Sequence, residues 1–143
     1  MNRCRCTPAQ VGQYLGKLSQ PLLDRLDLCA DVSPVDFDGM SNGKIGENTK
    51  QVRMRVEAAQ QIQRERFKDE KIQFNGEMSG KQVENFCHLD DSAGRLLKMA
   101  FQHMPFSARA YHRILKVART IADMEASETI NKEHLGEALS YRS

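Results

Sequence analysis

Three cationic side chains recur at helical spacing in the last third of the chain. Arg109, Arg113 and Lys116 are separated by four and then three residues, so they share one face of a predicted α-helix. A row of cations on one face can bind an anion such as a phosphate group or a nucleic-acid backbone. Most charged helix faces are merely solvated, however. The spacing leaves both interpretations open.

A second candidate is Arg25, which lies in a short turn predicted between a helix and a strand. An arginine in such a turn can reach an anion held by a neighbouring molecule, because its guanidinium forms paired hydrogen bonds with phosphate. The alternative is a surface ion pair with Asp24 or Asp27. The residues alone do not decide between the two.

Metal and phosphate-loop signals are weak. Cys4 and Cys6 could form half of a thiolate site, but the other two cysteines are distant, so we predict free thiols and no metal site in this chain.

The stretches 12–18 and 76–82 imitate a phosphate loop. Each has three residues between its glycines instead of four, and neither has a Ser or Thr after the lysine. Three histidines are expected on exposed helix faces: His103, His112 and His134.

Composition favours a modest helical domain. The chain has 143 residues, a net charge of +2, 40% hydrophobic residues and only 6% aromatic residues with no Trp, so aliphatic and Met side chains must fill the core. The charge is too balanced to require a nucleic-acid or membrane partner. No apolar run approaches the length of a membrane span, and the cysteine use fits a reducing compartment. We therefore expect a soluble cytoplasmic protein.

Local capping signals position these candidates on helices. Thr7-Pro8-Ala9-Gln10 is a capping box that opens a helix closed by Pro21, and 28–32 has the length of a single strand. A stretch rich in Gly and Pro, 33–48, predicts a linker. Further helices are predicted from about Thr49 to Phe67 and after caps at Ser79, Asp90 or Asp91, Ser107 and Asn131. The last long helix carries an apolar stripe opposite the cationic face, with Arg119 near the cations.

Longer runs resemble a known family. Ser-Gln-Pro-Leu-Leu-Asp-Arg-Leu-Asp-Leu over 19–28, Ser-Ala-Arg-Ala-Tyr-His-Arg-Ile-Leu-Lys-Val-Ala-Arg-Thr-Ile-Ala-Asp over 107–123, and the ending at 137–143 resemble the magnesium-chelatase-like AAA+ ATPases of the ComM/YifB type. The resemblance covers nearly the whole chain. Gln20 departs from it, since the family usually has Gly before this Pro.

The resemblance implies a mainly α fold in three parts. Residues 1–33 would be the end of the α/β nucleotide-binding core, with a helix, a turn and one strand; 34–48 would be a linker, and 49–143 the AAA+ C-terminal helical lid bundle. The family's Walker A and Walker B motifs would lie upstream. ATP and Mg²⁺ would then be bound mainly outside this chain, which would not hydrolyse ATP alone.

The resemblance also implies roles for the cations. Arg25 matches an arginine finger that acts on the nucleotide of a neighbouring subunit, and Arg109 matches the sensor 2 arginine at the start of the lid helix. Arg113 and Lys116 remain candidate contacts to an anion or nucleic acid. The partners implied are further copies of the chain in a ring, such as a hexamer, and DNA, in competence or recombination. The competing hypothesis is a stand-alone helical module that binds nucleic acid or protein.

Overall fold

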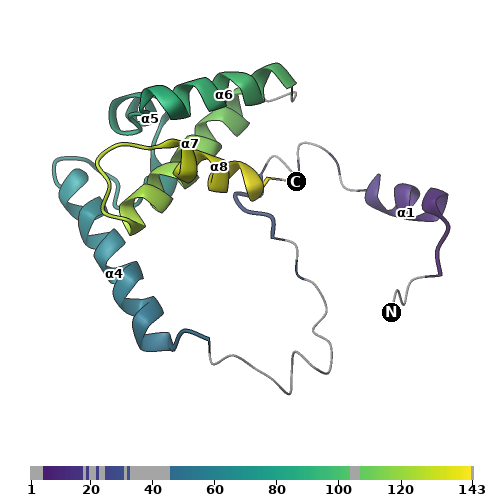
Figure 1. The fold of residues 1–143 in the computed structure, drawn as a ribbon, viewed down its shortest axis with the longest axis horizontal. Helices are drawn as coiled ribbons and strands as arrows, with labels where there is room; N and C mark the ends of the chain where they lie inside the picture. The colour runs from purple at the N-terminus through teal and green to yellow at the C-terminus, as the bar shows by residue number, and fades with distance from the viewer. Residues whose placement is uncertain are drawn as a thin grey trace.

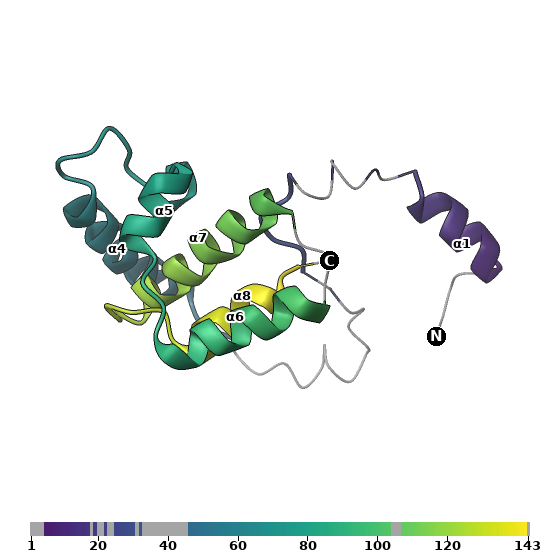
Figure 2. The same ribbon diagram turned by 90° about the horizontal axis from the view of Figure 1, so that it is seen from above.

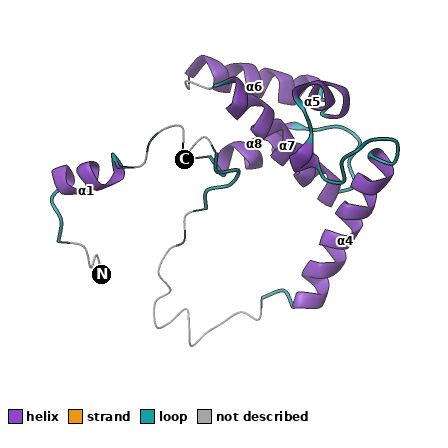
Figure 3. Ribbon diagram, turned by 180° about the vertical axis from the view of Figure 1, so that it is seen from behind, coloured by secondary structure: helices purple, strands orange, loops and turns teal. Residues whose placement is uncertain are grey.

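The computed structural model describes residues 5–17, 19, 22, 25–30, 32, 46–103 and 107–142. This part of the chain is mainly helical, as predicted (Figure 1; Figure 3). Its elements are α1 (Pro8–Leu15), α4 (Thr49–Arg66), the 3-10 helix η1 (Asn75–Glu77), α5 (Gly80–Phe86), α6 (Asp91–His103), α7 (Ala108–Met124) and α8 (Lys132–Ser140).

Side-chain caps begin the helices where the sequence predicts them. Capping boxes form at Thr7 with Gln10 and at Ser79 with Gln82, where each polar side chain bonds the other residue's backbone N–H. Single side-chain oxygens cap the later helices. Asp90 Oδ1 accepts from the Ala93 N–H at 2.7 Å before α6, and Ser107 Oγ accepts from the Ala110 N–H at 3.2 Å before α7. The predicted cap of the last helix is also present, at Asn131.

Helix α7 is the centre of a helical bundle. It packs against α8, α4, η1 and α5, and α6 packs on α8; Figure 2 shows α7 between the α4 and α5 side and the α6 and α8 side. The apolar stripe of α7 is the middle of the core, as its 3.6-residue period predicts. The buried apolar cluster includes Phe67, Met78, Val83, Ala93, Ile114, Leu115, Ala118, Ala122, Ile130 and Leu135.

The segment before residue 33 differs from its prediction in two ways. No strand forms at the described residues of 28–32; the Cys29 N–H donates to the Tyr141 carbonyl at 2.7 Å, and a single bond of this kind builds no ladder. Helix α1 ends at Leu15, earlier than Pro21, and it stands apart from the bundle (Figure 1). Its stripe is exposed, with Val11 at 41% and Tyr14 at 71%. Because no described surface packs against this apolar stripe of α1, it remains exposed to solvent.

Two further predictions lie on undescribed residues. Most of the predicted linker, at 33–45, and the stop of α6 at Met104-Pro105 lie outside the described ranges.

A left-handed residue closes α7. The Ala126 N–H donates to the Asp123 carbonyl at 3.1 Å and the Ser127 N–H to the Ala122 carbonyl at 2.9 Å, which is the Schellman pattern. The pattern requires a positive φ, and Ala126 adopts 53° where glycine is usual. This turn fixes the carbonyls of the loop that follows α7.

Candidate functional site

A groove of about 750 Å³ runs along α7 and gathers the cations predicted from the sequence. Arg109, Arg113 and Lys116 all line it, together with His112. The opposite walls come from η1 and the start of α5, from the end of α8, and from residues Asp27 and Leu28. The apolar part of the lining is formed by Met78, Val117, Ile121 and Met124. The helical spacing therefore does bring the three cations to one surface.

Arg113 is occupied by the N-terminal segment. Its Nη1 donates to the Leu26 carbonyl at 2.8 Å, and its Nε lies 2.6 Å from Asp27 Oδ1. The Arg113 side chain is 19% exposed, whereas that of Asp27 is 72% exposed. Arg113 is therefore neither a solvated surface cation nor an open anion contact in this structure.

Lys116 and Arg109 differ from Arg113 in their surroundings. Lys116 Nζ donates to the Gly76 carbonyl at 2.9 Å, so a neutral group positions its charge at the groove wall. Arg109 is exposed in the first turn of α7. The N-terminal end of a helix carries partial positive charge, which adds to that of Arg109. This end of the groove therefore suits an anionic ligand.

Arg25 is exposed and does not line the groove. Its backbone N–H donates to the Leu22 carbonyl at 3.0 Å, so it sits in a turn, as predicted. Of its two predicted acidic partners, Asp27 pairs with Arg113 and Asp24 lies outside the described residues. Arg25 thus directly precedes Leu26 and Asp27, the two residues through which its segment is attached to α7.

The cysteine chemistry is limited in the described part of the chain. Cys6 is an exposed free thiol, and Cys4 lies outside the described residues. Among the residues described, no cluster of His, Cys, Asp and Glu could hold a metal ion. Burial raises the pKa of the Cys87 thiol to about 11, so this side chain is an unreactive part of the core.

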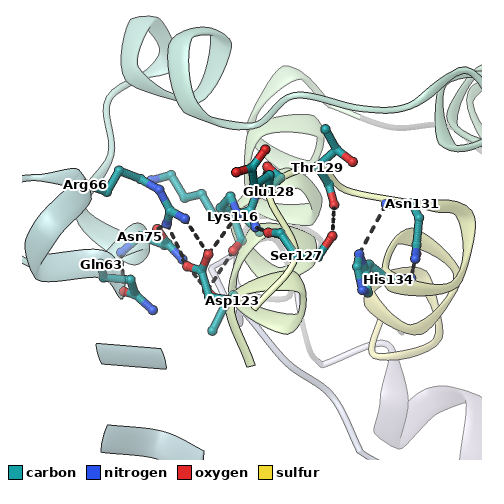
Figure 4. Close-up of polar contacts among 12 residues, drawn as sticks. Gln63, Arg66, Asn75, Lys116, Asp123, Ser127, Glu128, Thr129, Asn131 and His134 are labelled. Carbon is teal, nitrogen blue, oxygen red and sulfur yellow. Dashed lines mark hydrogen bonds and ion pairs between the residues drawn. The ribbon is translucent and has the colours of Figure 1, made fainter. Parts of the chain in front are cut away.

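A buried polar network is the main feature that sequence reasoning missed (Figure 4). Asp123, on α7, is 1% exposed and accepts from Arg66 Nη1 and Nη2, from Asn75 Nδ2 at 2.8 Å, and from Arg119 Nε at 3.1 Å. Gln63 Oε1 in turn accepts from the Asn75 N–H at 3.0 Å. The network joins α4, η1 and α7.

Arg119 was expected near the exposed cations, and this is wrong. It is 1% exposed, and it donates to the Glu128 carbonyl at 2.7 Å and to the Ser127 carbonyl. Burial lowers the pKa of its guanidinium, and the charge of Asp123 opposes that shift. The signal was available, because Arg119 and Asp123 are four residues apart and Arg119 follows directly on the buried Ala118 of the apolar stripe.

His134 was also expected at the surface and is 1% exposed instead. Its Nδ1 accepts from the Asn131 N–H at 3.2 Å, and its Nε2 lies 2.9 Å from Glu125 Oε2. The imidazole therefore completes the cap of α8 in place of the usual Glu or Gln. His112 is half-buried at the groove wall, and His103 is exposed.

Family models match both parts of the chain. The model described as magnesium chelatase, subunit ChlI C-terminal, matches residues 46–142, and the model described as magnesium chelatase, subunit ChlI, matches residues 1–40. Residues 46–142 contain the whole helical bundle, including the groove cations on α7.

Curated relatives match almost all of the chain. It is 41% identical over 140 residues to the competence protein ComM of Haemophilus influenzae, with 97% of this chain and 27% of that protein covered. It is 40% identical over 144 residues to the uncharacterized protein YifB of Salmonella typhimurium, with 99% of this chain and 28% of that protein covered. The uncharacterized protein Rv2897c of Mycobacterium tuberculosis is 33% identical over 139 residues, which are 97% of this chain and 27% of the relative. The chain thus spans little more than a quarter of these relatives.

The helices that the structure describes include none that is both long and apolar enough to cross a membrane.

Proposed function

Because this chain belongs to the magnesium chelatase family, we propose that it is the C-terminal lid segment of an ATP-hydrolysing AAA+ ring protein and couples nucleotide state to motion. One observation carries the proposal. Arg109, at the start of α7, opens onto the same groove to which the segment bearing Arg25 is attached through Asp27. A lid built this way responds to a phosphate group at Arg109 and holds the arginine turn one helical turn further along α7, at Arg113.

The two arginines have different roles in this proposal. Arg109 is the sensor 2 residue, whose exposed guanidinium follows the charge of a bound nucleotide and so sets the position of the lid. Arg25 is the arginine finger, which extends to the nucleotide of the neighbouring copy in the ring and neutralises the negative charge that develops in phosphoryl transfer. Such a finger contributes roughly 10³-fold or more to the rate in comparable systems.

The cofactors in this proposal are ATP and Mg²⁺. The described residues offer cations that suit phosphate oxygens but no cluster that would hold a metal ion. Three of the four glycines in the two imitation phosphate loops lie in helices, Gly12 in α1, Gly76 in η1 and Gly80 in α5. The nucleotide and its metal ion are therefore assigned to the longer part that the relatives have beyond the matched region.

The proposed motion of the lid acts on DNA and takes place in the cytoplasm. The support is the name of one relative, the competence protein ComM. The stand-alone binding module is the second candidate, and the contacts of the cations favour it less. Arg113 is bound to Leu26 and Asp27, and Lys116 to Gly76, so two of the three cations already have partners within the chain.

A chimera tests the assignment. This chain replaces the matching part of the Haemophilus ComM protein, and ATP turnover and ATP affinity are measured for the chimera and for its Arg25→Ala and Arg109→Ala variants. We expect Arg25→Ala to lower kcat about 10³-fold with ATP affinity retained. Arg109→Ala should change both ATP affinity and turnover.

Arg64→Ala is the matched control, because Arg64 is an exposed arginine on α4, away from the groove. Its turnover should equal that of the unsubstituted chimera. Wild-type turnover in Arg25→Ala would refute the finger assignment. For the binding-module alternative, the isolated chain should bind duplex DNA with an affinity that falls steeply with salt, and absence of binding at low salt would reject that alternative.

A further inference from the structure

The Arg25 turn is physically fastened to the lid at two points. Arg113 on α7 binds the Leu26 carbonyl at 2.8 Å and the Asp27 carboxylate at 2.6 Å, and the Cys29 N–H donates to the Tyr141 carbonyl just after α8 at 2.7 Å. We propose that these contacts form a clamp, here called the 26–29 clamp, through which the lid positions Arg25. Arg113 is then a positioning residue for the finger. This inference rests on the proposed function.

The geometry of Arg113 favours positioning over ligand binding. The Arg113 guanidinium contacts two consecutive residues through two different nitrogens: Nη1 donates to the Leu26 carbonyl and Nε pairs with the Asp27 carboxylate. These two contacts fix both the direction of the segment and its distance from α7. A lysine has a single nitrogen at this end and cannot make the same forked contact. The side chain is also only 19% exposed, so its charge faces the segment more than solvent.

The clamp carries motion because both of its anchors lie on the lid. Arg113 is on α7, one helical turn after Arg109, and Tyr141 directly follows α8, which packs on α7. A shift of α7 that follows from a ligand at Arg109 must therefore also displace residues 26–29 or break the clamp. Arg25 immediately precedes this stretch, so nucleotide sensed at the groove and the position of the finger are linked within one chain.

Cys29 reports the clamp without any ATPase assay. Its thiol is half-buried. In a Cys4→Ser/Cys6→Ser background the one other thiol is that of Cys87, which is buried and has a pKa raised to about 11. Maleimide labelling of this chain at about pH 8 is then followed by mass spectrometry. We expect Arg113→Gln and Asp27→Asn each to raise the labelling rate of Cys29 about three- to fivefold, the release expected from losing one partly exposed ion pair.

Three variants make the labelling result specific. Arg113→Lys keeps the charge but not the fork and should be intermediate. The double variant Arg113→Gln/Asp27→Asn should label no faster than Arg113→Gln, because that single variant already removes the ion pair together with the Leu26 bond. Arg64→Gln, an exposed arginine on α4, should label at the wild-type rate. Equal labelling of Cys29 in all variants would overturn the clamp.

The coupling is then tested in the ComM chimera. Arg113→Gln and Asp27→Asn should lower kcat by at least about tenfold with the KM for ATP nearly unchanged, since a misplaced catalytic group costs rate more than ground-state binding. Arg113→Lys should restore part of kcat. Faster labelling with unchanged kcat would refute positioning by Arg113. Failure of the finger assignment itself is seen separately, as wild-type turnover in Arg25→Ala with the labelling results intact.

Discussion

At the scale of single residues, the strongest constraint on this fold is Asp123. Its carboxylate is buried with the guanidiniums of Arg66 and Arg119 and the amide of Asn75 around it. Removing charges from water costs several kcal/mol each, so such a group is tolerated only when its partners are complete. They are: within the described residues, no buried side-chain nitrogen or oxygen lacks a hydrogen-bond partner.

Asp123→Asn should therefore destabilise the bundle by about 3–5 kcal/mol, because it leaves the buried guanidinium of Arg119 and the partly exposed guanidinium of Arg66 facing a neutral amide. Urea denaturation followed by circular dichroism gives the free energy of unfolding. Asp69→Asn is the control, since Asp69 is exposed in the loop after α4, and its effect should stay within about 0.5 kcal/mol. A loss of less than 1 kcal/mol in both variants would show that the network contributes little.

At the scale of elements, the start of α6 depends on one carboxylate. Asp90 accepts from the Ala93 N–H and the Ser92 hydroxyl, both at 2.7 Å, while its own N–H donates to the Ile130 carbonyl at 3.0 Å. The bonds from Ala93 and then Ser92 lower the pKa of Asp90. Backbone bonds hold residues 88–90 beside Ile130, where the bridge between Leu89 and Ile130 joins the segment before α6 to the loop before α8.

A pH dependence follows with a definite sign. The pKa of Asp90 is lower in the folded chain than in the unfolded chain, so below about pH 4 the unfolded chain binds the proton first. The contribution of Asp90 is present above that pH and is lost as the pH falls through the folded-state pKa. Asp90→Asn keeps a capping oxygen without this titration.

We therefore expect Asp90→Asn to match the urea midpoint of the wild type at about pH 6 and to lose less stability on acidification to about pH 3. Urea midpoints at the two pH values measure this. Asp91→Asn changes the adjacent carboxylate and serves as the control. Parallel losses in Asp90→Asn and the wild type would contradict the assignment of Asp90 as the acid-labile cap.

At the scale of the whole molecule, the buried apolar cluster belongs to the helical bundle, and none of the described residues before residue 46 is part of it. All residues of the buried apolar cluster lie between Phe67 and Ala138, and no residue of α1 is buried. The bundle and this N-terminal part meet at the 26–29 clamp, whose bonds are partly exposed and contribute modestly to stability.

A variant beginning at residue 46 should therefore fold as well as the complete chain. Its far-UV circular dichroism should show the bundle helices, and its Tm should fall by no more than about 4 °C, the shift expected from about 1 kcal/mol in a domain of this size. A fall of more than 10 °C would show that the N-terminal part supports the bundle, and would count against the predicted division of the chain near residues 34–48.

Sequence reasoning was most successful where the determining contacts are local. A capping oxygen and the N–H that it accepts are three residues apart, so Thr7, Ser79, Ser107 and Asn131 could be identified as helix starts from their neighbours alone. The stripe of α7 and the grouping of Arg109, Arg113 and Lys116 follow in the same way from the helical period.

Only the tertiary structure decided which polar side chains are buried and what they bind. Arg119 and His134 look like surface residues until loops and caps close around them, and Arg66 and Asp123 are 57 residues apart in the chain. The same holds for Arg113, whose partners Leu26 and Asp27 come from another part of the molecule. The 3.6-residue period of a helix determines the face on which a side chain lies. The free energy of a charged side chain, however, depends on the groups that surround it in space.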